Sequence, residues 1–209
     1  MATWKRLWRS RFKLPLLGYR PLPEAWRHME EPYWGDEAVV VDCETSHFDR
    51  NTGELLSLAT VKVVNHTVQL SSALEVTLNT DTHTDPQAVR IHGLRREDRF
   101  HGISSDEAID KFLNFVGNRP ICGFFINYDR SILNRYVHAR YGFHLPNEFI
   151  EVSQLYIRYL RKKNPNLQDN LTFEHLAEEL NIPIFDRHTA LGDATSTALM
   201  YIKLSKKLS

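Results

Sequence analysis

Cysteine is scarce in this sequence, and neither sign of charge predominates. Only two cysteines occur, Cys43 and Cys122, and each lies in an apolar run typical of a strand. They are expected to be reduced thiols in the core of a cytoplasmic protein, which argues against a disulfide scaffold and a cysteine-based zinc site. Lys and Arg total 26 and Asp and Glu total 26, so no overall basic field indicates a polyanionic partner. No apolar stretch approaches the roughly 20 residues of a membrane span, and the N-terminus lacks an apolar signal-peptide core.

The first 36 of the 209 residues differ in character from the rest. The first twenty contain six basic residues and no acidic one, and large apolar side chains recur at helical spacing: Trp4, Leu7, Trp8 and Phe12. Prolines at positions 15, 21, 23 and 32 interrupt any longer regular element. We predict that residues 1–36 form an N-terminal extension and residues 37–209 one domain. The extension either docks on nucleic acid, a protein partner or a membrane surface, or packs on its own domain.

The order of expected elements indicates an α/β fold. After an opening strand near residues 38–46, the segments Glu54–Val64 and Thr67–Leu78 flank a turn at Asn65 and His66, and a further strand is expected over Pro120–Ile126. Helices are expected over residues 85–93, 104–116, 129–140, 154–160, 172–183 and 190–209. Three strands before the first helix predict a mixed sheet. The basic residues 161–163 are expected to open a polar loop, which either contacts a phosphate backbone or is simply solvated.

The stretch Ala38–Ser46, AVVVDCETS, breaks from apolar residues into two carboxylates. In a strand, Asp42 and Glu44 share one face while Cys43 points to the other. A buried pair of carboxylates repels unless a cation lies between them, and a divalent cation meets that need. The alternative is that both are solvated where the chain leaves the sheet.

Two further acidic positions follow. Asp129, in CGFFINYDRSIL, comes where a buried strand leads into a helix, and it is either a metal ligand or an ordinary helix cap. In RHTALGDA, His188 precedes Asp193 by five residues, and Asp193 falls in the first turn of the last helix. Asp193 has the same two interpretations, and His188 is either catalytic or an exposed imidazole.

Together these residues match the needs of two-metal phosphoryl hydrolysis. Carboxylate oxygens suit Mg²⁺ or Mn²⁺. Two ions about 4 Å apart would stabilise the attacking and leaving oxygens, and an imidazole would accept a proton from the attacking water.

The motifs DCE, then YD opening a helix, then H-x-x-x-x-D resemble those of the DnaQ-like, or DEDDh, 3′-5′ exonucleases, a family that includes proofreading subunits of bacterial DNA polymerases. The resemblance covers Ala38–Ser209 and implies a ribonuclease H-like mixed sheet of about five strands flanked by helices. It implies that Asp42 bridges two divalent cations, that Glu44 and Asp193 complete the shell of one, and that Asp129 holds the other partly through water. His188 would be the general base.

The same resemblance implies substrate contacts. Thr45 matches a position that contacts the terminal nucleotide through its main chain or hydroxyl, and Phe48 corresponds to an apolar residue that wedges against the terminal base. His92, in IHGL, either approaches the substrate or has a structural role at a helix end. The chain departs from many relatives at Phe124–Phe125, where they carry His-Asn.

We therefore expect a metal-dependent exonuclease that acts on 3′ ends of single strands, with DNA favoured, and releases nucleoside 5′-monophosphates. An RNA-trimming exoribonuclease, a dinucleotide phosphodiesterase and a non-catalytic nucleic-acid-binding module are the alternatives. A protein partner bound through the N-terminal extension is compatible with the sequence, which predicts neither an oligomeric state nor a polymerase association.

Overall fold

The computed structural model describes residues 21–164 and 171–209. The predicted aromatic and basic helix before Pro15 lies outside these ranges.

The sheet joins an antiparallel half to a parallel half. Its strand order is β3-β2-β1-β4-β5, in which β1 pairs antiparallel with β2, β2 antiparallel with β3, β1 parallel with β4, and β4 parallel with β5. The strands are β1 (Glu37–Thr45), β2 (Leu55–Val64), β3 (Thr67–Thr77), β4 (Ile121–Gly123) and β5 (Phe149–Glu151). The predicted α/β fold with a mixed sheet of about five strands is confirmed for the described part of the chain.

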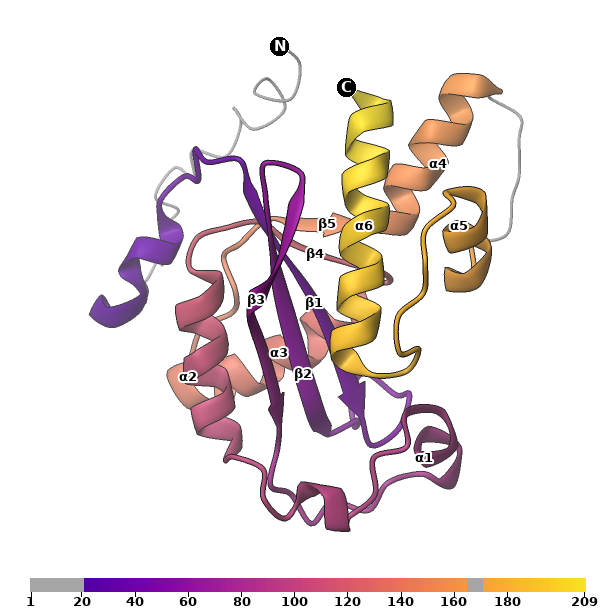
Figure 1. Cartoon of the computed structure of the whole chain (residues 1–209). Helices are drawn as coiled ribbons and strands as arrows, with labels where there is room; N and C mark the ends of the chain where they lie inside the picture. The colour runs from indigo at the N-terminus through magenta and orange to yellow at the C-terminus, as the bar shows by residue number, and fades with distance from the viewer. Residues whose placement is uncertain (1–20, 165–170) are drawn as a thin grey trace.

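Helices cover both faces of this sheet (Figure 1). On one face lie α2 (Ser105–Val116) and α3 (Asn127–Tyr141), and on the other lie α4 (Val152–Lys163), α5 (Phe173–Glu179) and α6 (Ala190–Leu208). The short helix α1 (Pro86–His92) lies beyond the end of β1, where the Asp85 N–H donates to the Ser46 carbonyl at 2.8 Å.

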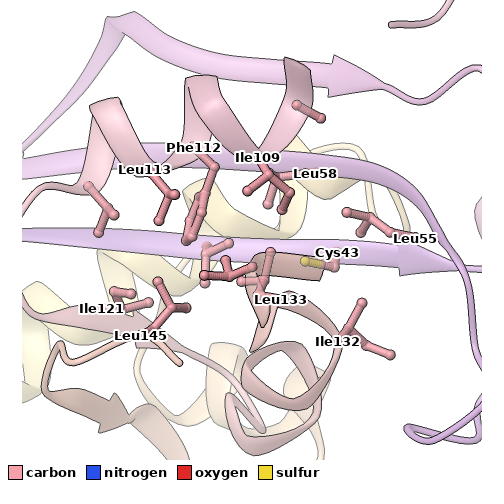
Figure 2. Close-up of a cluster of buried hydrophobic side chains, with 14 of the residues drawn as sticks. Cys43, Leu55, Leu58, Ile109, Phe112, Leu113, Ile121, Ile132, Leu133 and Leu145 are labelled. Carbon is pink, nitrogen blue, oxygen red and sulfur yellow. The ribbon is translucent and has the colours of Figure 1, made fainter. Parts of the chain in front are cut away.

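Side chains along β1 alternate between two apolar cores. Val39, Val41 and Cys43 belong to the core under α2 and α3, and Figure 2 shows the Cys43 sulfur in that cluster with side chains of β2 and α2. Val40 belongs to the core under α4, α5 and α6. Because successive side chains of a strand point to opposite faces, the residues two and four positions after Val40 also point toward the face covered by α6.

Several local predictions are confirmed. The turn at Asn65 and His66 has φ angles of 48° and 60°, which suit a tight hairpin. Helix α1 begins after the Asp85 cap and ends at Gly93, whose φ of 72° is left-handed. Ser104 caps α2 through the N–H of Glu107.

Two local predictions are wrong. The strand expected over Pro120–Ile126 ends at Gly123, because the chain turns at Phe124 and Phe125, where φ of Phe125 is 54°. Residues 161–163 form the last turn of α4 and not a loop, since basic side chains are favourable at a helix C-terminus. Strand β5 was not predicted.

Part of the predicted extension packs on the domain. The 3₁₀-helix η2 (Glu24–Glu30) buries Trp26 and Met29, which join Leu22 and Val39 in one core cluster. The boundary at residue 36 stays a prediction. Within the described ranges, no helix is both long and apolar enough to cross a membrane.

Candidate active site

The two carboxylates of β1, Asp42 and Glu44, lie on the same face of the sheet as Val40. Asp42 pairs in register with Ala59 and Glu44 with Ser57, and the register shifts between Glu44 and Thr45. The ladder of β1 therefore continues regularly through Glu44 and becomes irregular where the strand ends. Asp42 and Glu44 project toward α6 from a rigid central strand.

Asp193 lies in the first turn of α6, close to Asp42 and Glu44. The side chain of Thr189 caps this helix by accepting from the N–H of Gly192. At Gly192 a Cβ would lie 2.4 Å from the Phe185 carbonyl oxygen, so only glycine allows the preceding loop to pack this closely. Asp42, Glu44 and Asp193 each offer a carboxylate oxygen, and these oxygens all lie within 4.8 Å of one another. Three of the four predicted metal ligands thus converge.

Asp129 lies in the first turn of α3 and is 5% exposed. It does not cap the helix, because Ile126 occupies the cap position. Burial raises the pKa of Asp129 to about 7, and hydrogen bonds to its carboxylate from its own backbone N–H and from the Cys43 thiol oppose that rise. Asp129 stands outside the group of three yet is near enough to raise the pKa of Asp42.

Burial and mutual repulsion make these carboxylates hard to ionise. Burial raises the pKa of Asp42 well above its ordinary value, and the charges of Asp129, Glu44 and Asp193 raise it further. For Glu44, burial followed by the charges of Asp193 and Asp129 raises the pKa to about 8. A bound divalent cation would favour the ionised form of every member, so the donor set fits such an ion.

Arg187 supplies positive charge at this site, and the sequence analysis missed it. Its Nη1 donates to Oδ2 of Asp193, and its Nε donates to Oε1 of Glu174 at 2.8 Å. Burial raises the pKa of Asp193, and Arg187 opposes that rise most strongly. Its position next to His188 in RHTALGDA was the available signal.

The loop before α6 holds His188 close to Asp193. The His188 backbone N–H donates to Oδ2 of Asp193 at 3.2 Å, and the residue adopts a left-handed φ of 67°. Its charged form lowers the pKa of both Asp193 and His92, so it lies near both.

The three predicted substrate-binding residues lie in different settings. Thr45 is 5% exposed, and its hydroxyl is 2.6 Å from the hydroxyl of Tyr128. Phe48 is 57% exposed on the loop after β1. The buried His92 accepts at Nδ1 from the Leu94 N–H at 3.0 Å, and burial lowers its pKa.

A pocket of about 290 Å³ opens beside the acidic cluster. Two carboxylates of the acidic cluster and three phenylalanines from separate segments of the chain line this pocket. The lining residues are Asp42, Asp193, Phe124, Phe125, Thr172, Phe173, Glu174 and Arg187. The Phe124 ring meets the Phe173 ring edge-on, with 5.2 Å between centroids.

Glu151 anchors the loop that carries Phe125. Its two carboxylate oxygens accept from the N–H groups of Phe125 and Ile126 at 2.9 and 2.8 Å. The same side chain caps α4 through the N–H of Ser153. Sequence patterns alone do not indicate this role, because it depends on the parallel pairing of β4 with β5.

Known proteins resemble this chain over most of its length. The family model described as "Exonuclease" matches residues 39–201. The DNA polymerase III subunit epsilon of Aquifex aeolicus is 27% identical over 171 residues, which are 81% of each chain. A DNA polymerase III PolC-type protein of Thermotoga petrophila is 24% identical over 173 residues, covering 81% of this chain and 12% of that protein.

Solved structures share the fold. Exonuclease I of E. coli in complex with a dA16 oligonucleotide superposes with a TM-score of 0.67 at 16% identity, covering 81% of this chain and 41% of that chain. Its complex with a dT13 oligonucleotide has a TM-score of 0.69 at 16% identity, with 82% and 41% covered. This chain therefore spans less than half of the exonuclease I chain.

Proposed function

We propose, from the premise that this chain belongs to the DnaQ-like 3′-5′ exonuclease family, that it removes nucleotides from the 3′ ends of single-stranded DNA and releases nucleoside 5′-monophosphates. The convergence of Asp42, Glu44 and Asp193 within 4.8 Å is the observation that carries this function. Two neighbours support the proposal: the charge of Asp129 raises the pKa of Asp42, and the His188 backbone N–H donates to Asp193.

Two divalent cations, Mg²⁺ or Mn²⁺, suit this donor set. Asp42, Glu44 and Asp193 would hold one ion, and Asp42 and Asp129 the other, in part through water. Bound ions of this kind polarise the scissile phosphate and lower the pKa of a water molecule.

The side chain of His188 would accept the proton of the attacking water. Its backbone hydrogen bond to Asp193 holds the residue at the edge of the acidic cluster, while the imidazole is only half-buried and so can reach solvent. An imidazole titrates near neutral pH and is suited to this transfer.

The terminal nucleotide would lie between the loop after β1 and the aromatic pocket. Because the Thr45 hydroxyl is bonded to Tyr128, Thr45 would contact the nucleotide through its main chain. Phe48 is exposed and free to stack on a base, and His92 would approach the sugar-phosphate from α1.

The preference for DNA rests on the relatives. The Aquifex aeolicus protein is a subunit of a DNA polymerase, and the exonuclease I structures contain deoxyoligonucleotides. By the same analogy, the N-terminal extension would bind a protein partner such as a polymerase subunit.

The test is digestion of matched 5′-labelled single-stranded DNA and RNA oligonucleotides with Mg²⁺ or Mn²⁺, with Asp42→Ala run in parallel. We expect a ladder that shortens from the 3′ end, faster on DNA, and that disappears in the variant and in chelator. Faster digestion of RNA would reassign the substrate. No ladder on either polymer would contradict the proposed function.

A further inference from the structure

Arg187 lies between the acidic cluster and the aromatic pocket. Its guanidinium donates through Nη1 to Asp193 and through Nε to Glu174, at 2.8 Å for the second bond. The guanidinium carbon also lies over the face of Phe173, 4.2 Å from the ring centroid. One side chain thus contacts a candidate metal ligand and two residues of α5.

Two of these three contacts do not involve the metal ligands. Glu174 and the Phe173 ring hold Nε and the plane of the guanidinium against α5. The side chain of Arg187 is 29% exposed and lines the pocket, so it is neither locked in a core nor free in solvent. The contact with Asp193 can therefore be lost while the arginine stays at the pocket wall.

A cation held by Asp42, Glu44 and Asp193 would share the Asp193 carboxylate with Arg187, because Oδ2 accepts from the arginine while Oδ1 is buried and has no hydrogen-bond partner within the described residues. Both are positive, so they repel each other. This repulsion would weaken the bond from Nη1 to Asp193 and free Nη1 for another acceptor, while Nε stays bound to Glu174. A guanidinium presented in this way binds phosphate oxygens well.

We propose that Arg187 is a phosphate-binding residue released by metal binding. In the metal-free protein it pairs with Asp193; in the metal-bound protein it contacts a backbone phosphate of the strand in the pocket. The proposal rests on the proposed function, because it takes a nucleic acid strand as the occupant.

The first test measures metal binding without nucleic acid. Arg187→Gln in the full chain should bind Mn²⁺ severalfold more tightly than the wild type by calorimetry, because a competing cation has been removed. If Arg187 only braces the loop before α6, the variant should bind Mn²⁺ more weakly. Unchanged or weaker Mn²⁺ binding would overturn the proposal.

The second test measures binding of a labelled single-stranded oligonucleotide in Ca²⁺ and in chelator. In Ca²⁺, Arg187→Gln should weaken binding about tenfold and reduce the magnitude of the salt slope by about 0.7, the value for one phosphate contact to a single strand. In chelator the two proteins should differ much less. An equal loss in both conditions would disprove the release by metal, and no loss in Ca²⁺ would disprove the phosphate contact.

Two variants serve as controls. Arg158→Gln removes the same charge from an exposed position on α4 and should bind Mn²⁺ and oligonucleotide like the wild type. Arg187→Lys keeps the charge but loses the planar guanidinium that stacks and donates two hydrogen bonds, so its affinities for Mn²⁺ and for the oligonucleotide should lie between those of the wild type and Arg187→Gln. If Arg187→Gln fails to fold, Arg187→Lys replaces it in both tests. Failure of the proposed function is distinguishable, since the wild type itself would then produce no ladder with Mg²⁺ or Mn²⁺, whereas the proposal for Arg187 is tested by binding alone.

Discussion

The backbone N–H of His188 donates a hydrogen bond to Oδ2 of Asp193, with 3.2 Å between nitrogen and oxygen. His188 adopts a φ of 67°, which is uncommon for a residue other than glycine. A carboxylate at the start of α6 therefore stabilises an unfavourable backbone conformation in the loop before it. This bond depends on the backbone of His188 and not on its imidazole, so the two roles can be separated by mutation.

His188→Ala should lower the rate of 3′ digestion by roughly 10²- to 10⁴-fold, the range for loss of a general base. Mn²⁺ binding should change little, because the backbone hydrogen bond to Asp193 remains. Single-turnover digestion and calorimetry measure the two quantities. His188→Asn tolerates a positive φ and should be equally slow; wild-type activity in either variant would remove His188 from the mechanism.

Asp42→Ala should abolish turnover, because both metal sites would lose a ligand. The same change should raise the melting temperature in chelator, since it removes one of several buried or partly buried carboxylates that repel one another. Gel digestion and thermal unfolding measure these effects. Near-normal digestion by Asp42→Ala would show that the acidic motif is not the metal site.

The metal-free protein should lose stability as pH rises from about 5 to about 8. Burial raises the pKa of Glu44 to about 8 and that of Asp129 to about 7, above their values in the unfolded chain. An acid whose pKa is raised by folding stabilises the fold at low pH and loses that contribution as pH passes through the raised pKa. We expect a loss on the order of a few kcal/mol in chelator, largely restored by Mg²⁺. Urea unfolding across this pH range tests it, and a rise in metal-free stability with pH would contradict the assignment.

Glu151→Ala should loosen the loop between β4 and α3. Three backbone N–H groups, those of Phe125, Ile126 and Ser153, lose their acceptor, which costs about 1–3 kcal/mol of unfolding free energy for each one left buried. Because Asp129 follows this loop directly, we expect slower digestion and weaker Mn²⁺ binding as well. Glu179→Gln, at an exposed position of α5, is the matched control. Wild-type Mn²⁺ affinity in Glu151→Ala would show that the loop is held by other contacts.

Trp26 should matter for folding and not for chemistry. It is 6% exposed and meets the Tyr141 ring edge-on, with 5.5 Å between centroids. Trp26→Ala should cost about 3–5 kcal/mol of unfolding free energy. Trp26→Phe should cost less, because the indole N–H has no hydrogen-bond partner within the described residues. Deletion of residues 1–36 removes Leu22, Trp26 and Met29 from the core and should cost more than Trp26→Ala; wild-type stability after this deletion would support a boundary at residue 36.

Local patterns were sufficient for most of the elements. The helix from Asp85 to Gly93 was predictable because its cap, its first-turn proline and its terminal glycine act on neighbouring backbone groups. Strand β5 was not, because three residues show no periodicity and its existence depends on pairing with β4. Residues 161–163 were misjudged because their polarity is equally typical of a loop and of the last turn of a helix.

The sequence by itself determined the mixed α/β order and, through strand alternation, that Asp42 and Glu44 share one face of β1; Asp129 and Asp193 were expected beside them from the resemblance to the exonuclease motifs. Only the tertiary structure decided what surrounds them. Arg187, Phe173 and Glu151 gain their contacts from segments far apart in the chain, and no local periodicity encodes such contacts. Whether a buried carboxylate faces another carboxylate, a thiol or a guanidinium is a property of packing, and that packing set the electrostatics of this site.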